Sequence, residues 1–262
     1  MNPLILNEIF RMRRDYKGIS INTSKNTHER VFSLLDTNRD AVIVDIPTGS
    51  GAFVQRLKDN GFKNIKAVDI EDIMEIEHAD FHTGDMTKTL PFPDQSVDAV
   101  VCIDGIEHIS QQFDFVTQVN RILREGGYFI VSTPNISSLR SRWKWFMTGH
   151  HHKCSSPLDE NNPNPLHHIG MISFPELRYL LHTSGFSIDK VTANRVKPVS
   201  WMFMLFLPLI YIVTSIVYRK SGRKKDTIMI NREVKKVMFS KVLLFGESLI
   251  VRAGKTVHKE VD

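Results

Sequence analysis

Short apolar runs alternate with helix-like stretches through the first half of the chain. Residues 42–45, 65–69 and 96–103 are apolar runs flanked by turn residues, which predicts three strands. Between them, residues 53–60 and 113–124 repeat apolar side chains at the spacing of one helical face. Strands separated by helices indicate βαβ units, so the pattern predicts a parallel sheet.

The second half of the chain is less regular. No periodic pattern runs through residues 135–172, which we call the lid segment. A helix is predicted over residues 174–184, with a proline in its first turn and a glycine just beyond its end. Residues 186–194 and the end of the segment 240–256 are predicted strands.

The most apolar stretch comprises residues 201–218, which include no charged side chain. As a helix it would measure roughly 27 Å, just short of the ~30 Å hydrocarbon core of a bilayer. Pro208, near its middle, is expected to break helical hydrogen bonding and bend the segment. A basic cluster follows at once, as at the positively charged flank of a membrane segment. It consists of Arg219, Lys220, Arg223, Lys224 and Lys225. A buried cap helix and a homodimer interface are the alternatives.

Composition narrows the expected partners and location. The formal net charge of +5 is small for 262 residues, so nucleic acid is not an expected partner. Cys102 lies in an apolar run and Cys154 in the lid segment, which argues against a disulfide framework and for a reducing compartment. The N-terminus places its charges after a very short apolar run, the reverse of a secretory signal. We therefore expect a cytoplasmic location.

The turn at residues 45–51, with the sequence DIPTGSG, is the first candidate for a binding site. It follows a predicted strand and precedes a helix, and its glycines allow the backbone to approach a ligand closely. Asp69 ends the next predicted strand, where a carboxylate can accept hydrogen bonds from both hydroxyls of a ribose. The combination predicts a site for a nucleotide-type cofactor, whereas the turn alone would fit any strand–helix connection.

The string VIVDIPTGSGAF at residues 42–53 resembles the first motif of class I S-adenosylmethionine-dependent methyltransferases (type 11/12). Later blocks of that family are similar to GDM at 84–86, LPFPDQSVDAVVCIDGIEHI at 90–109 and REGGYFIVSTPN at 124–135. The chain departs from the family at Pro47, which replaces the first glycine and removes one backbone donor to the cofactor. The glycine spacing disfavours a hydride-transfer enzyme, since those carry G-x-G-x-x-G.

The resemblance implies an α/β fold, a doubly wound Rossmann-like sheet of seven strands whose last two form an antiparallel hairpin. Residues 186–194 suit the sixth strand and residues 247–255 the seventh. Residues 41–195 plus 240–257 would then form the methyltransferase domain, preceded by N-terminal cap helices in residues 1–40. Residues 196–239 become an apolar and basic insertion before the last strand.

The resemblance also implies S-adenosylmethionine as cofactor, held at the carboxyl ends of the strands. The implied cofactor-binding residues are Asp45, Pro47, Gly49 and Gly51 in the first turn, Asp69 at the ribose, Asp85 and Met86 at the adenine, and Asp104 near the amino-acid moiety.

Methyl transfer depends mainly on in-line placement of the acceptor, although a hydroxyl acceptor gains from a base. Glu107 and His108, just past the fourth strand, and His168, before the helix at 174–184, are the candidate catalytic residues. His108 could equally be a residue that only packs or caps at a helix start. No metal site is expected, because the adjacent histidines at 150–152 cannot all face one ion.

Strands six and seven must lie on the same side of a membrane in order to pair. The insertion is therefore expected to lie on or re-enter the membrane from the cytoplasmic face, with its basic residues at anionic headgroups. A broad resemblance to methyltransferases of bacterial surface-polysaccharide clusters suggests O-methylation of a lipid-linked sugar. The alternatives are a quinone-like phenol, as for ubiquinone-biosynthesis O-methyltransferases, and a non-catalytic cofactor-binding scaffold disabled by Pro47.

Overall fold

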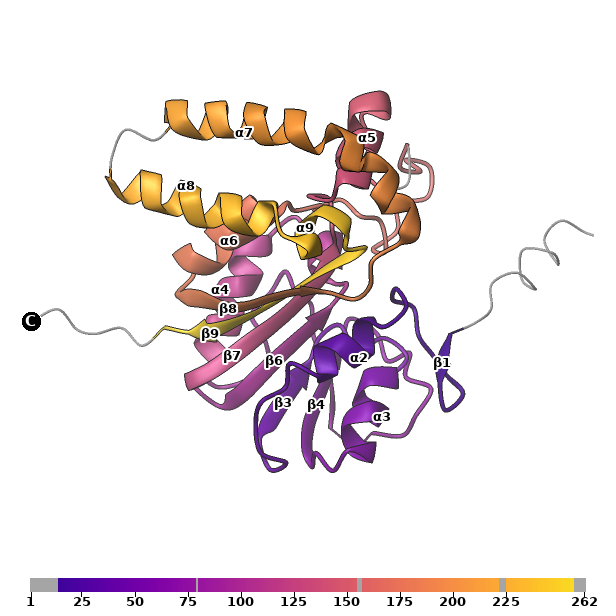
Figure 1. Cartoon of the computed structure of the whole chain (residues 1–262). Coiled ribbons are helices and arrows are strands. Elements are labelled where there is room, and N and C mark those ends of the chain that lie inside the picture. The colour runs from indigo at the N-terminus through magenta and orange to yellow at the C-terminus, as the bar shows by residue number, and fades with distance from the viewer. Residues whose placement is uncertain (1–13, 79, 155–156, 222–224, 257–262) are drawn as a thin grey trace, which may run out of the picture.

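The computed structural model describes residues 14–78, 80–154, 157–221 and 225–256 and contains a seven-stranded sheet (Figure 1). The strands lie in the order β5-β4-β3-β6-β7-β9-β8, all parallel except β9, which is antiparallel to both neighbours. Their bounds are β3 Val42–Asp45, β4 Asn64–Asp69, β5 Phe81–Thr83, β6 Val97–Ile103, β7 Leu123–Pro134, β8 Phe186–Ala193 and β9 Ser248–Lys255. This confirms the expected doubly wound sheet and its antiparallel last pair.

Both faces of the sheet are covered by helices, which explains why its parallel strands are continuous apolar runs. Ile43 and Val44 are neighbours on β3, both 0% exposed, yet they belong to separate cores on opposite faces. One core includes side chains of α2 (Thr27–Phe32) and α3 (Ala52–Asp59). The other includes those of α4 (Gln112–Ile122) and α6 (Phe174–Thr183).

Helix α4 ends two residues before the predicted boundary, and β7 begins at Leu123, directly after it. Gly126 and Gly127 therefore lie inside the strand. A side chain at Gly127 would come within 2.9 Å of the Arg124 carbonyl oxygen, so close backbone approach explains this glycine.

The described part of the N-terminal segment differs from the expected cap helices. It contains a hairpin of β1 (Asp15–Tyr16) and β2 (Ile19–Ser20), followed by the single helix α2. Tyr16 donates a hydrogen bond to Asp59 at 2.9 Å, which docks the hairpin on α3. Residues 1–13 lie outside the described residues.

The lid segment contains helix α5 (Leu139–Thr148), which its sequence pattern did not predict. Ser138 caps the helix by accepting from the Ser141 amide, and Gly149 ends it with φ +71°. The sequence has no regular spacing of apolar residues here because α5 packs against the insertion rather than against the sheet. This packing leaves Trp145 and Phe146 exposed.

The insertion forms a helical hairpin over one end of the sheet (Figure 1). Its elements are the 3₁₀ helix η2 (Pro198–Phe206), α7 (Leu207–Ser221) and α8 (Lys225–Met238); the short helix α9 (Lys241–Phe245) follows it, before β9. The chain changes from 3₁₀ to α-helix at Leu207, so Pro208 lies in the first turn of α7 and does not interrupt it. Pro198–Lys220 is long and apolar enough to cross a membrane by length and composition, with mean hydropathy 2.0, and only 11% of its most apolar window is buried.

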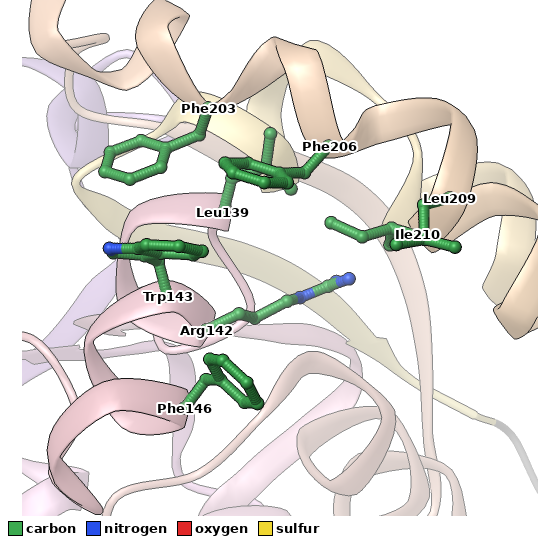
Figure 2. A pocket seen from close by; sticks show the side chains of 8 residues that line it. All are labelled: Leu139, Arg142, Trp143, Phe146, Phe203, Phe206, Leu209 and Ile210. Carbon is green, nitrogen blue, oxygen red and sulfur yellow. The ribbon is translucent and has the colours of Figure 1, made fainter.

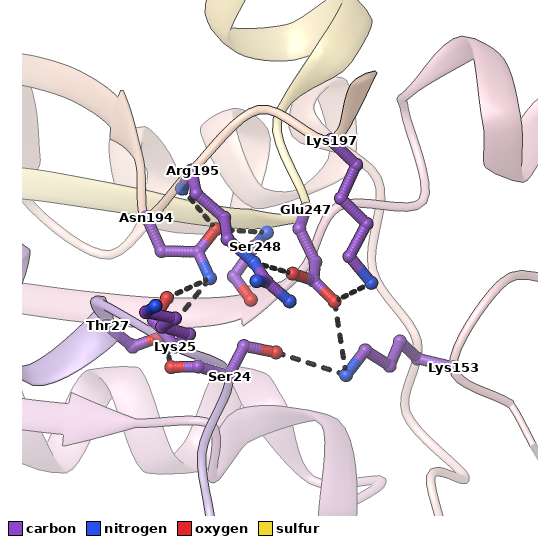
Figure 3. Close-up of polar contacts among 9 residues, drawn as sticks. All are labelled: Ser24, Lys25, Thr27, Lys153, Asn194, Arg195, Lys197, Glu247 and Ser248. Carbon is purple, nitrogen blue, oxygen red and sulfur yellow. Dashed lines mark hydrogen bonds and ion pairs between the residues drawn. The ribbon is translucent and has the colours of Figure 1, made fainter. Parts of the chain in front are cut away.

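A cluster of charges closes the base of the insertion, between β8 and β9 (Figure 3). Glu247, whose side chain is 2% exposed, pairs with Arg195 at 2.5 Å, Lys197 at 2.6 Å and Lys153 at 3.5 Å. Burial alone would raise the pKa of Glu247, but these three cations outweigh it and lower the pKa to about 2. A β-bridge between Val196 and Gly246 lies beside the cluster and completes the closure.

Glu247→Gln should destabilise the protein at neutral pH by on the order of 3 kcal/mol, because the folded state lowers the pKa of this group from 4.5 to about 2. That stability is present above pH 4.5 and is lost as the pH falls through 2. Urea unfolding from pH 7 to pH 2 should therefore give a flatter acid dependence for Glu247→Gln. Glu71→Gln, at an exposed site, is the control. Equal acid dependence in all three proteins would contradict this account.

Candidate active site

The carboxyl ends of four neighbouring parallel strands bring the predicted cofactor residues to one edge of the sheet. Asp45 and Asp69 end β3 and β4, whereas Asp85 and Asp104 follow β5 and β6. The order β5-β4-β3-β6 places the loops after these strands side by side. This edge is where ligands of open α/β sheets bind.

The glycine turn is tied to both flanking strands. The Thr48 amide donates to the Val68 carbonyl at 2.9 Å, and its hydroxyl donates to Asp45 at 3.0 Å. Asp45 is 1% exposed, and burial, opposed by the Thr48 bond, raises its pKa to about 7. Asp45 thus orients the turn through its hydrogen bond with Thr48. Direct contact between Asp45 and the cofactor stays a prediction.

Gly49 and Gly51 have φ +55° and +84°, the left-handed region that favours glycine. A side chain on Gly49 would enter open space, so its backbone borders room for a ligand. Pro47 is accommodated by Gly105, the residue after Asp104, where a Cβ would lie 2.3 Å from the proline ring. Sequence reasoning missed this partner, because no local pattern links residues 47 and 105.

Asp69 fits the ribose role. Its Oδ2 accepts the Gly49 amide at 2.8 Å and its Oδ1 accepts the Ile70 amide at 2.7 Å. Each oxygen keeps a free lone pair, so the carboxylate is oriented by the loop and can still accept two hydroxyl donors. The glycine turn and Asp69 therefore fit a ribose-containing cofactor.

Asp85 and Met86, the two residues expected at the adenine, have fewer groups available for contact with a ligand than Asp69 has. Asp85 accepts both the amide and the hydroxyl of Thr87 at 2.8 Å, and Met86 is 8% exposed in the core below the edge. Their contact with a base stays a prediction.

The three candidate catalytic residues meet in space. Glu107 and His108 lie in the 3₁₀ helix η1 (Ile106–His108), and His168 comes from the lid segment. One side-chain donor atom from each lies within 4.8 Å of the others, and the two imidazole rings are 4.8 Å apart between centroids. Gly170 of the lid segment donates to the Glu107 carbonyl at 2.8 Å, which holds the two segments together.

The group is largely removed from water. Burial lowers the pKa of His108 and of His168, and the charge of His108 lowers the latter further. Burial, and then the charge of Asp104, raises the pKa of Glu107 well above its ordinary value. Both imidazoles are therefore neutral at pH 7 and able to accept a proton.

The comparisons with known proteins agree with this geometry. The model of the family described as "Methyltransferase domain" matches residues 44–131, from β3 into β7. Residues 44–131 are a methyltransferase domain.

Relatives and solved structures extend that similarity. A protein of Mycolicibacterium smegmatis named as an S-adenosylmethionine-dependent methyltransferase is 36% identical over 110 residues, which is 42% of this chain and 36% of the relative. A fatty-acid O-methyltransferase of the same organism is 46% identical over 52 residues, 20% of this chain and 18% of that protein. The fold resembles a SAM-dependent methyltransferase of Thermotoga maritima at TM-score 0.54 and 17% identity, covering 88% of each chain. The chain thus matches about a third or less of the length of these two sequence relatives.

Asp104 and Lys153 connect the methyltransferase domain to the lid segment. Ser132 donates to the Asp104 carboxylate at 2.6 Å; burial raises the pKa of Asp104, against this bond and the Lys153 charge. Lys153 donates to Ser24 at 3.1 Å and pairs with Glu247, so one side chain joins three segments (Figure 3). An isolated lysine in an irregular segment has no sequence signal for such a role.

His151 and His152 of the lid segment are separate from this group. His151 contacts the Ser141 hydroxyl at 3.2 Å and stacks on Trp145. Burial, and then the charges of Arg140 and Lys197, lowers the pKa of His152 to about 4. These histidines attach the loop to α5.

Asp69→Ala should weaken binding of S-adenosylmethionine, the cofactor that the sequence motifs imply. Each hydrogen bond to a charged group contributes roughly 1.5–3 kcal/mol, so affinity should fall at least tenfold in calorimetry. Glu71→Ala, two residues on and exposed, is the control and should bind normally. Unchanged affinity of Asp69→Ala would remove Asp69 from the ribose site.

Proposed function

We propose that this protein transfers the methyl group of S-adenosylmethionine to an oxygen of an amphipathic, lipid-linked acceptor at a membrane surface. The observation that carries the proposal is an apolar pocket at the same edge of the sheet as the cofactor loops. Strands β7 and β8 are both antiparallel to β9, so their carboxyl ends lie at one edge. The lid segment leaves β7 there, and the insertion leaves β8 there.

The pocket has a volume of about 280 Å³ and lies between α5 and the insertion (Figure 2). Its lining residues are Leu139, Arg142, Trp143, Phe146, Phe203, Phe206, Leu209 and Ile210. Trp143 stacks on Phe206 with ring centroids 4.9 Å apart. Arg142 is the charged residue of the lining; burial lowers its pKa, but a guanidinium stays protonated in proteins. An apolar chain that carries an anionic group matches this lining.

The insertion presents many exposed apolar side chains beside the pocket. Helix α7 is the outer helix of the hairpin in Figure 1. The exposed apolar side chains of η2 and α7 include Trp201, Met202, Leu205, Leu209, Ile212, Val213, Ile216 and Val217. Apolar area of this extent is typical of an interaction surface.

The hairpin favours a helix lying on the membrane over one that crosses it. Helix α8 returns along α7, where Lys235 contacts the Ser215 hydroxyl at 2.5 Å and lies 3.9 Å from the Tyr211 ring centroid. Glu233 of α8 pairs with Arg178 of α6 at 2.7 Å. Because α8 is charged and attached to the domain, α7 cannot enter the hydrocarbon core alone without breaking these contacts.

Basic side chains suit the hairpin to anionic headgroups. Arg219 and Lys220 end α7, and Lys225 begins α8. Arg223 and Lys224 of the expected basic cluster lie outside the described residues. Each basic residue near an anionic surface contributes about 1 kcal/mol of attraction.

The active-site group suits a hydroxyl acceptor. The cofactor supplies an electrophilic methyl group on a sulfonium. His108 and His168, both neutral, can take the hydroxyl proton as the acceptor oxygen is aligned with that methyl group. A long-chain carboxylic acid is the second candidate acceptor, because the pocket is apolar and one relative is named a fatty-acid O-methyltransferase.

His108→Ala and His168→Ala should lower methyl transfer to a hydroxyl acceptor by roughly two to four powers of ten, while cofactor binding survives. Transfer of labelled methyl groups into a membrane lipid extract, followed by mass spectrometry, measures this. A carboxylate acceptor is already deprotonated, so normal turnover in both variants would favour the fatty acid. No labelled lipid product with wild-type protein would contradict the proposal.

The protein should sediment with anionic vesicles. Replacing Leu205, Ile212 and Ile216 by Gln should release it, since each buried apolar side chain contributes roughly 1.5–3 kcal/mol. These substitutions test the exposed side chains more specifically than a deletion of residues 201–218, because the deletion would also remove Phe203 from its packing with Leu139. Added salt should weaken binding through the basic residues.

Ile73→Gln, at an exposed site after β4, is the control and should sediment normally. A wild-type protein that ignores vesicles but dimerises through the same three residues would assign the apolar surface to a second copy of the chain.

A further inference from the structure

Glu107 is the least satisfied buried group of the active site. Its residue is 0% exposed, and neither carboxyl oxygen makes a hydrogen bond within the described chain. The Thr133 hydroxyl lies close enough to the Glu107 carboxyl group to oppose the effect of burial on its pKa, but no hydrogen bond of ordinary geometry joins the two groups. Buried charges in proteins are normally paired or coordinate a metal, and no cation within the described chain pairs with the Glu107 carboxyl group.

We propose that Glu107, His108 and His168 bind a divalent metal ion with a coordination position left open. One donor atom from each of the three side chains lies within 4.8 Å of the others. Ligand atoms on a tetrahedral ion with bonds of ~2.0–2.1 Å lie about 3.4 Å apart, so small side-chain rotations close the site. The proposal departs from the expectation from sequence that no metal would be bound.

The histidines are already oriented as metal ligands. Nδ1 of His108 lies 3.3 Å from the His167 carbonyl oxygen, so its proton is directed there and Nε2 is left as the ligand. The Lys153 backbone near His168 opposes the effect of burial on the pKa of this imidazole, and the buried Nδ1 of His168 has no hydrogen-bond partner within the described residues. A backbone acceptor on the other ring nitrogen is the usual support of a metal-bound imidazole.

The fold holds the lid segment against η1 at this point. Gln112 of α4 donates from one side-chain nitrogen to the Ile106 carbonyl at 2.9 Å and to the Gly170 carbonyl at 2.6 Å. A side chain at Gly170 would lie 2.2 Å from the Ile109 carbonyl oxygen, so only glycine permits this approach. The three ligands are therefore brought together by backbone contacts that do not depend on the metal.

The ligand set selects the class of ion. Two imidazoles and one carboxylate suit Zn²⁺ and similar first-row ions, whereas Mg²⁺ and Ca²⁺ prefer oxygen ligands. Three protein ligands leave a fourth position for the acceptor, a role that rests on the proposed O-methylation. A hydroxyl bound there would have a lowered pKa and would release its proton to solvent, so that His108 and His168 would act as metal ligands in place of the general bases proposed above. The oxygen then attacks the methyl carbon, and the C–S bond breaks with its electron pair staying on sulfur.

Zinc titration of the chelator-stripped, full-length protein tests the site, in competition with a chromophoric chelator. Wild-type protein should bind one Zn²⁺, and Co²⁺ should give the visible spectrum of a four-coordinate site. His168→Ala and Glu107→Gln should weaken zinc affinity by more than the roughly 10–100-fold that loss of an outer partner costs. His182→Ala, an exposed histidine on α6, is the matched control and should bind as wild type. Circular dichroism and cofactor binding would show that each variant is folded.

Equal zinc affinity in wild type and His168→Ala, or no zinc binding by wild type, would overturn the proposal. Methyl transfer assays separate it from the proposed function. Full activity of the chelator-stripped protein on a hydroxyl acceptor would leave the methyltransferase intact and make His108 or His168 the base. Stoichiometric zinc binding without any methylated lipid would support the metal site and contradict the proposed function.

Discussion

The antiparallel pairing of β9 with both β7 and β8 is the constraint on which the arrangement of this protein depends. Backbone hydrogen bonds join β9 to β7 from Tyr128↔Gly254 to Pro134↔Ser248, and to β8 from Phe186↔Lys255 to Ala193↔Leu249. This pairing makes β8 run parallel to β7, so the insertion leaves the sheet at the edge where the cofactor loops lie. The apolar hairpin and the active-site group therefore share one end of the molecule.

Two buried glutamates near this edge show two solutions to the same electrostatic problem. Glu247 is surrounded by Arg195, Lys197 and Lys153, which lower its pKa to about 2 and close the base of the insertion. Glu107 has no cation in ion-pair contact within the described chain, and its neighbours are two imidazoles. The first arrangement stabilises the fold, whereas the second leaves a buried carboxyl group that would be charged only with a cation beside it.

Much of the sheet could be predicted from sequence because its strands are buried on both faces. Such strands are apolar throughout, and acidic or glycine residues at their carboxyl ends mark the loops of the site, as at Asp45 and Asp69. Elements that pack on other peripheral elements were missed or misjudged. Helix α5 contacts the insertion instead of the sheet, and the β1–β2 hairpin docks on α3 through Tyr16. Neither produces the periodic pattern that a sheet or core imposes.

By itself, the sequence determined the order of most strands of the sheet and of helices α3, α4 and α6, the glycine turn with Asp69, and the neighbouring positions of Glu107 and His108. These features depend on residues that are close together in the chain, because the spacing of such residues indicates the helix or strand to which they belong. Only the tertiary structure decided that His168, and not the histidines at 150–152, meets Glu107, and that Gly105 makes room for Pro47. It also decided that α7 is the outer helix of a hairpin held by α8. Each of these contacts joins segments that are far apart in the chain. They form because the folded sheet brings the segments together, and no local pattern of side chains in the sequence predicts such a contact.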